Sequence, residues 1–152
     1  RDALRDYLSR GPVLFADACC GSTRFDRSFR DLMGQMFPDH PLQPIPVDHE
    51  LFSDVTAHRI DRVRLRKMVA GAANAAMKSR TEVGPPVLEG VEIDGRYAVI
   101  YSRYDISCAL ENQASLACDG YVEEDAMKVA MNIVLYSMLQ DISGAWGDNT
   151  TD

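Results

Sequence analysis

One stretch, residues 11–37, constrains the fold of this chain more than any other. It opens with a short and continuous apolar run from Pro12 to Ala16, as expected for a strand that is covered on both faces. Asp17 ends the run, and the turn over 19–23 leads into a helix with one apolar stripe. Ser22 or Thr23 is expected to cap that helix. Such a unit places a polar turn at the carboxyl end of a buried strand, where open α/β sheets bind their ligands.

A second strong signal is the Asp94-Gly95 pair between two strand-like runs, 87–93 and 96–102, which predicts a β-hairpin. The second run is nearly continuously apolar, so we expect it to lie centrally in a sheet with the strand over 12–17. Together these patterns predict a three-layer α/β fold. Its sheet is expected to be mostly parallel, with helices on both faces and one antiparallel hairpin pair.

Two further segments complete the expected organisation. The small, featureless residues 70–77, followed by the breaker Gly84-Pro85-Pro86, predict a long loop from Met68 to Pro86 with at most one short helical turn. The last helix is expected to begin at Asp119 or Gly120. Its expected buried stripe comprises Ala126, Val129, Ala130, Ile133, Val134 and Met138. Residues 1–142 are interpreted as one domain and residues 143–152 as a polar tail.

Composition narrows the function classes. The chain has 152 residues, which is long enough for one domain with a sizeable core. Its net charge of -7 argues against a nucleic-acid-binding surface. No apolar run approaches the ~20 residues of a membrane span. The chain opens at Arg1 inside a helix-like pattern, so we interpret it as a piece of a longer polypeptide that lacks part of its sheet. Upstream sequence or a second copy would supply the missing neighbour of the first strand.

Carboxylates follow both central strand patterns. Asp17 ends the first strand and Asp105 follows the second, so the two side chains are candidates for acid/base chemistry or for sharing a metal ion. The alternative is that they are two unrelated turn residues. His49 is the third candidate catalytic residue, whereas His40 and His58 lie in polar surroundings typical of surface histidines.

The two polar turns together define the expected ligand-binding residues. Arg24, Arg27 and Arg103 are suited to an anion beside a helix N-terminus. Ion pairing with Asp26 and Asp31 is the alternative. The expected ligand contacts are Asp17, Cys19, Cys20, Gly21, Ser22, Thr23, Arg24, Arg103, Tyr104 and Asp105.

Several spaced motifs between Tyr7 and Gln140 resemble a bacterial family known only as a domain of unknown function. They are LFADACCG at 14–21, FDRSFR at 25–30, FPD at 37–39, DHELF at 48–52, PVLEG at 86–90 and YSRYDISCALE at 101–111. That family is similar to the class I glutamine amidotransferase-like fold, including its trehalose-utilisation branch. The resemblance implies a flavodoxin-like domain, truncated at its N-terminal side, in a periplasmic or envelope-associated protein.

The resemblance does not extend to glutaminase chemistry. The position of the amidotransferase nucleophile is occupied by Asp17, and the region matching the catalytic histidine, 103–105, contains no histidine. His49 lies in a segment that resembles a loop bordering the pocket in the trehalose-utilisation branch. The expected function is binding of a small polar ligand, a carbohydrate or an anion, at the carboxyl edge of the sheet, with catalysis left open. The alternative is a non-catalytic interaction module that associates with a second copy or with other domains of a larger envelope-associated protein.

Four cysteines remain, and without a CxxC pair a zinc knuckle is poorly supported. In a flavodoxin-like fold, Cys19, Cys20, Cys108 and Cys118 would fall on one edge of the sheet. We expect at least one disulfide joining Cys19 or Cys20 to Cys108 or Cys118 if the protein is exported. Reduced thiols would instead make a candidate soft-metal site, and inert buried cysteines are the third possibility. No cofactor is expected.

Overall fold

A computed structural model describes residues 1–69, 78–113 and 118–140 of the chain. The helices are α1 (Asp2–Ser9), α2 (Thr23–Met36), α3 (Ser107–Leu110) and α4 (Glu123–Leu139), with short 3-10 turns η1 (Cys19–Gly21) and η2 (Glu50–Phe52). The strands are β1 (Leu14–Asp17), β2 (Gln43–Pro44), β3 (Val63–Val69), β4 (Lys78–Gly84), β5 (Glu89–Ile93), β6 (Arg96–Ser102) and β7 (Gly120–Tyr121).

The strands form two mostly antiparallel sheets, so the expected flavodoxin-like fold is wrong. One sheet has the order β1-β6-β5-β2 and the other β4-β3-β7. Only β1 and β6 pair in parallel, and the long connection between them, which includes α2, permits this direction. Every other pair of strands in the described part is antiparallel. The result is a β-rich mixed fold with few helices, rather than a parallel three-layer sheet.

The Asp94-Gly95 hairpin is confirmed. Both turn residues have positive φ, 52° and 77°, and β5 pairs antiparallel with β6. The strand after the turn is central and buried from Tyr97 to Ser102, as its apolar run predicts. The first strand does pair with β6, with Leu14 opposite Val99, but it lies at the edge of the described sheet rather than in its centre.

The predicted loop over 68–86 is wrong at both ends. Strand β3 continues to Val69, and β4 begins at Lys78 and pairs with it along its whole length. The sequence of β4 is polar and carries no apolar alternation, so its strand character comes from pairing with β3 and from charge contacts such as Lys67 to Glu82 at 2.7 Å. Residues 70–77 and the expected tail over 143–152 lie outside the described residues.

The last helix begins at Glu123, later than predicted. Gly120 and Tyr121 are instead strand β7, which pairs with Arg66 and Leu65 of β3. Ala126, Val129 and Ile133 are buried as predicted, and Ala130 is partly buried against the same core. However, Val134 and Met138 are 56% and 72% exposed.

Two polar side chains of α4, Asn132 and Tyr136, are also buried, although the predicted apolar stripe did not include them. Asn132 donates to the carbonyls of Leu51 and His58 at 2.8 and 2.7 Å. The Tyr136 hydroxyl accepts the amide of Tyr97 at 2.9 Å. Because each buried polar atom has a partner, these side chains hold α4 on the sheet without an unpaired group.

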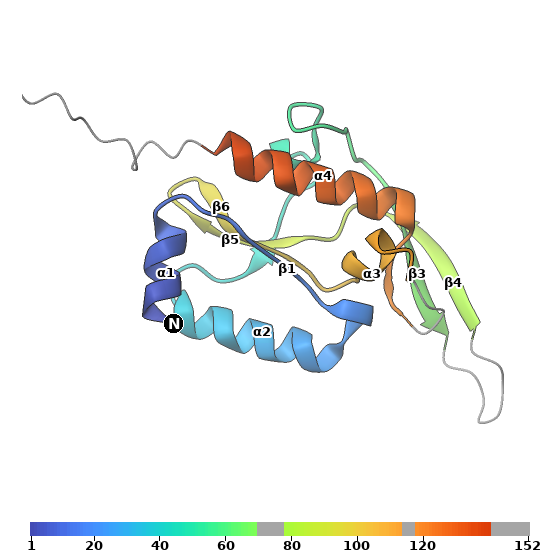
Figure 1. Cartoon of the computed structure of the whole chain (residues 1–152), viewed down its shortest axis with the longest axis horizontal. Helices are drawn as coiled ribbons and strands as arrows, with labels where there is room; N and C mark the ends of the chain where they lie inside the picture. Colours follow the sequence, from blue (N-terminus) through green and yellow to red (C-terminus); the bar gives the residue numbers. More distant parts are fainter. Residues whose placement is uncertain (70–77, 114–117, 141–152) are drawn as a thin grey trace, which may run out of the picture.

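The core lies on both faces of the four-stranded sheet. Figure 1 shows α1 and α2 against one face and α4 across the other. Phe29, Met33 and Met36 of α2 pack with Val91 and Val99, whereas Val129, Ile133 and Tyr136 of α4 pack with Ile100 and residues of the second sheet. Among the residues described, none of the helices has both the length and the apolar character needed to cross a bilayer.

Candidate functional site: a cysteine cluster

The parallel pairing of β1 with β6 brings two turns to the same edge of the sheet. The last pair of the ladder is Asp17 with Ser102, so η1 follows one strand where the turn before α3 follows the other. A third segment joins them, because the Asp105 amide donates to the Asp119 carbonyl at 3.0 Å and the Tyr121 amide donates to the Asp105 carbonyl at 2.9 Å. This pairing makes a bridge between Asp105 and Gly120 that connects the two sheets.

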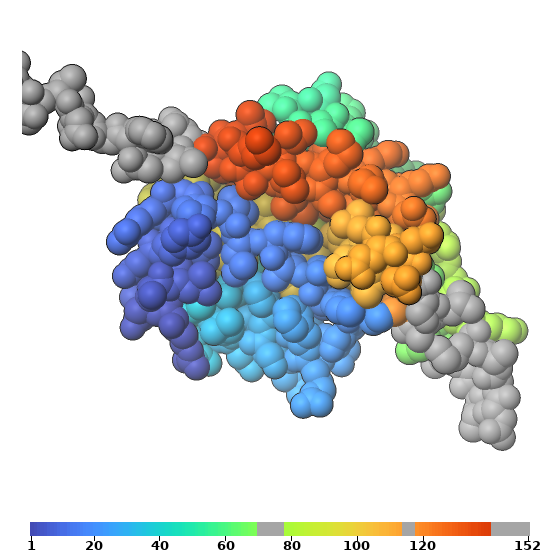
Figure 2. Space-filling model, in the orientation of Figure 1, coloured from blue at the N-terminus to red at the C-terminus, as the bar shows by residue number. Residues whose placement is uncertain are grey.

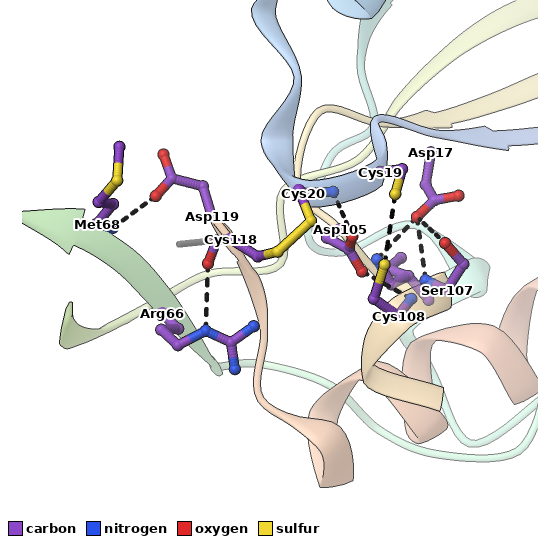
Figure 3. The surroundings of a disulfide bond; sticks show 11 residues. Asp17, Cys19, Cys20, Arg66, Met68, Asp105, Ser107, Cys108, Cys118 and Asp119 are labelled. Carbon is purple, nitrogen blue, oxygen red and sulfur yellow. Dashed lines mark hydrogen bonds between the residues drawn. A yellow bond between two sulfur atoms is a disulfide. The ribbon is translucent and has the colours of Figure 1, made fainter. Parts of the chain in front are cut away.

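All four cysteines lie at this edge (Figure 3). Cys20 and Cys118 form a disulfide across a sequence separation of 98 residues. The other two are free thiols, with the Sγ atoms of Cys19 and Cys108 3.4 Å apart. Cys19 is exposed and Cys108 is half-buried, so the thiol pair reaches the surface through Cys19.

Asp105 is the buried carboxylate of the cluster, only 1% exposed. It accepts the amide of Cys108 at 2.9 Å and also the amide of Cys20. The pKa of the Cys108 thiol is raised to about 12 by hydrogen bonding to Asp105 and to Cys19 and by burial. Asp105 therefore fixes the positions of two cysteines while it disfavours a free thiolate between them.

Asp17 caps the start of α3. One of its carboxylate oxygens accepts the amides of Ile106 and Ser107 at 2.9 and 3.0 Å and the hydroxyl of Ser107 at 3.0 Å. The structure thus brings Asp17 and Asp105 to one edge, as expected, but both carboxylates are engaged by the chain. Their observed role is to hold Cys108 beside the turn that carries Cys19.

The turn between β1 and α2 is shaped by its backbone. Gly21 has φ of 68°, and a Cβ at this position would lie 2.7 Å from the Cβ of Asp119. Its small size lets the segment with Cys118 pack directly on the turn. Ser22 then caps α2 by accepting the amide of Phe25 at 3.3 Å, as one of the two predicted caps.

The remaining predicted contacts lie around this turn. Thr23 and Arg24 are exposed at the start of α2. The Arg103 guanidinium lies over the ring of Tyr104, 5.3 Å from its centroid. The predicted carboxylate partner of the α2 arginines is instead used by Arg30, which contacts Asp26 at 3.0 Å.

Arg66 is a site residue that the sequence did not reveal. Its Nε donates to the carbonyl of Cys118 at 3.2 Å, and its Nη2 is buried with no hydrogen-bond partner in the described chain. The signal that would have found it is the pairing of Arg66 with Gly120, which only the tertiary structure supplies.

His49 lies away from the cluster, at the other end of β6. Its ring packs against Tyr97 and Tyr136, with centroids 4.9 and 5.8 Å away, and its Nδ1 accepts the amide of Leu51. Burial lowers the pKa of His49. The structure therefore does not bring His49 together with Asp17 and Asp105, and its observed role is packing and a local turn.

A separate cleft of about 440 Å³ lies near the Asp94-Gly95 turn, opposite the cysteine edge. Its polar lining includes Asp39, His40 and Glu92. His40 thus faces a cleft rather than open surface alone, although none of the predicted ligand contacts lies there.

Comparison with known proteins identifies a family. No curated protein matches the chain. A family model described as a domain of unknown function, DUF4159, matches residues 1–138, and this match carries no amidotransferase relationship. The chain therefore belongs to the DUF4159 family of domains of unknown function.

Proposed function

We propose that this domain is a thiol–disulfide redox module in which Cys19 and Cys108 interconvert between a dithiol and a disulfide. The proposal rests on one observation, the 3.4 Å separation of the two Sγ atoms beside an existing disulfide. A disulfide bond is roughly 2.05 Å long, so closure needs a sulfur movement of only about 1–2 Å. Side-chain rotation on two fixed backbones can supply such a movement.

The exposures of the two thiols assign their roles. Exposed Cys19 attacks a disulfide of a partner protein or small molecule, which breaks that bond and releases one partner thiol. Half-buried Cys108 then attacks Cys19 Sγ while its proton passes to the departing partner sulfur, which forms the Cys19–Cys108 bond and releases the second partner thiol. The partner is reduced by two electrons and the module is oxidised by two.

The rest of the cluster positions this pair. Asp17 caps α3, and Asp105 holds the amides of Cys20 and Cys108, so the attacking and resolving residues are fixed relative to each other. The Cys20–Cys118 bond ties the same turn to the second sheet.

Redox titration of the intact chain tests the proposal. The chain is equilibrated in thiol buffers of defined potential, alkylated and digested, and the Cys19–Cys108 peptide pair is quantified by mass spectrometry. We expect one two-electron transition that C19S and C108S each abolish, while the fully reduced wild type reduces 5,5′-dithiobis(2-nitrobenzoate) with formation of the same bond. Absence of a Cys19–Cys108 bond at every potential would overturn the proposal.

Binding of a small anion at the same edge is a second candidate, favoured by the buried Nη2 of Arg66 without a partner in the described residues. It keeps the expectation of a polar ligand at the carboxyl ends of β1 and β6. Thermal shift with phosphate, sulfate and simple sugars tests it. Stabilisation by an anion that R66M abolishes supports this candidate, and no shift with any probe contradicts it.

The alternative of a non-catalytic interaction module is favoured by one surface. Met127, Met131 and Val134 of α4, with Leu110 of α3, line an apolar groove of about 330 Å³. Figure 2 shows α4 and α3 side by side on the viewer's face of the molecule. Light scattering of the wild type and M131E tests whether this groove is an interface between copies. A monomeric wild type contradicts that reading.

A further inference from the structure

Four sulfur atoms from three separate segments meet at the edge of the sheet. Cys19 and Cys20 come from the turn after β1, Cys108 from α3, and Cys118 from the segment before β7. The Sγ atoms of Cys19, Cys20 and Cys108 and a carboxylate oxygen of Asp105 all lie within 4.8 Å of one another. Cys118 Sγ is bonded to Cys20 Sγ, so the fourth sulfur belongs to the same group.

We infer that, once the Cys20–Cys118 bond is reduced, this cluster binds one thiophilic divalent cation of the Zn²⁺ class through Cys19, Cys20, Cys108 and Cys118. Thiolates select such ions, and four thiolates complete a closed tetrahedral site. A tetrahedral ion with bonds of about 2.3 Å spaces its sulfur ligands by roughly 3.8 Å. The 3.4 Å between Cys19 and Cys108 Sγ is close to that spacing.

Metal binding first requires a reductant of the phosphine or dithiol class, which reduces the Cys20–Cys118 bond. Two electrons and two protons convert the Cys20–Cys118 bond into two thiols, and the reductant is oxidised. The cation then displaces four thiol protons to solvent as the four metal–sulfur bonds form. No partner protein takes part, so metal binding does not depend on the redox exchange proposed above.

Asp105 acts outside the ligand set in this arrangement. Its two oxygens accept the amides of Cys20 and Cys108, so it orients two of the ligand residues instead of binding the ion. Four thiolates around a divalent ion carry a net charge of about −2. Arg66 lies beside Cys118 and has a buried Nη2 without a partner among the described residues, so it offers a positive charge and a spare donor to such a centre.

Cobalt binding to the intact chain tests the inference. The chain is reduced with a phosphine under anaerobic conditions and titrated with Co²⁺, and then with Zn²⁺ in competition. We expect one ion per chain, with sulfur-to-cobalt charge-transfer bands and the intense visible bands of tetrahedral Co²⁺, both displaced by Zn²⁺. A reduced chain that yields no charge-transfer band would overturn the inference.

Variants separate the ligands from their surroundings. C118S and C20S are each expected to lose charge-transfer intensity and to bind Co²⁺ at least tenfold more weakly, while R66M weakens binding by about tenfold with an unchanged tetrahedral spectrum. H40A, at the opposite cleft, is the matched control and should bind as the wild type does. Wild-type affinity in C118S contradicts the ligand set, and circular dichroism establishes that each variant is folded.

The proposed metal binding and the proposed redox exchange can be disproved independently of each other. A chain that binds Co²⁺ through thiolates but never forms the Cys19–Cys108 bond keeps the metal site and loses the redox function. A chain that forms the Cys19–Cys108 bond reversibly but gives no charge-transfer band supports the redox function and rules out the metal site.

Discussion

The Sγ atoms of Cys19 and Cys108 lie 3.4 Å apart although 89 residues separate them in the sequence. The parallel pairing of β1 with β6 brings the turn after each strand to the same edge, and the bridge between Asp105 and Gly120 adds the segment with Cys118. Residues from distant parts of the chain therefore share one small volume. Each chemical proposal for this protein depends on that arrangement.

Removing the resolving thiol should trap an intermediate. In C108S, exposed Cys19 still attacks a small disulfide such as oxidised glutathione, but no second thiol displaces the product. We therefore expect a stable mixed disulfide on Cys19, detected as a glutathione adduct by intact mass. C19S is the matched variant and should show at least tenfold less adduct. Equal adduct formation in the two variants would contradict the assigned roles.

Breaking the Cys20–Cys118 bond should lower the free energy of unfolding. The bond closes a loop across 98 residues, for which the chain-entropy model gives a contribution of about 4–5 kcal/mol. We expect C118S to lose about 2–5 kcal/mol relative to the oxidised, metal-free wild type in urea titrations. A difference below about 1 kcal/mol would show that the bond does not constrain the unfolded chain.

Gly21 should not tolerate a side chain. Its φ of 68° and the 2.7 Å approach of a Cβ to Asp119 predict that G21A costs about 1–3 kcal/mol of stability. Gly34 is the matched control, since it lies inside α2 with no atom within 4 Å of an added Cβ. G34A should stabilise the protein by up to about 1 kcal/mol. Urea titration of both variants measures these effects, and equal stability of the two is the contrary outcome.

The Asp17 cap on α3 should affect both stability and the formation of the Cys19–Cys108 bond, because it holds Cys108 in position. D17A removes the acceptor of three hydrogen bonds and leaves the amides of buried Ile106 and half-buried Ser107 unpaired, so we expect a loss of about 1–3 kcal/mol. It should also slow closure of the Cys19–Cys108 bond, followed by timed alkylation. D39A, at an exposed site, is the control. A D17A variant that closes this bond at the wild-type rate would argue against the positioning role.

We expect Asp125 to contribute stability that is lost in acid. Its burial opposes ionisation, but hydrogen bonds from Arg64 outweigh this and lower the pKa of Asp125. A carboxyl with a lowered folded pKa stabilises the protein above its unfolded value, about 3.9, and the contribution disappears as pH falls through the folded value. The gap in unfolding free energy between wild type and D125N should therefore shrink as pH falls below about 4. A constant gap from pH 7 to pH 2 is the contradicting result.

Local chemistry let the sequence by itself determine the strand–turn–helix unit, a capping hydroxyl at Ser22 or Thr23, the Asp94-Gly95 hairpin and the buried run of β6. In each case the signal lies within a few residues: an apolar run, a capping hydroxyl or a pair that adopts positive φ. The sequence also pointed to the polar turn after β1, because a turn at the end of a strand is a local property.

Only the tertiary structure decided the direction of the sheets and the membership of the site. Strand β4 has a polar sequence and becomes a strand by pairing with β3, and Gly120 leaves the last helix for the same reason. His49 lies outside the expected site and Arg66 lies within it, because packing against Tyr97 and pairing with Gly120 are long-range contacts. Such contacts depend on which distant segments pack together, and the local pattern of residue types does not determine which segments those are.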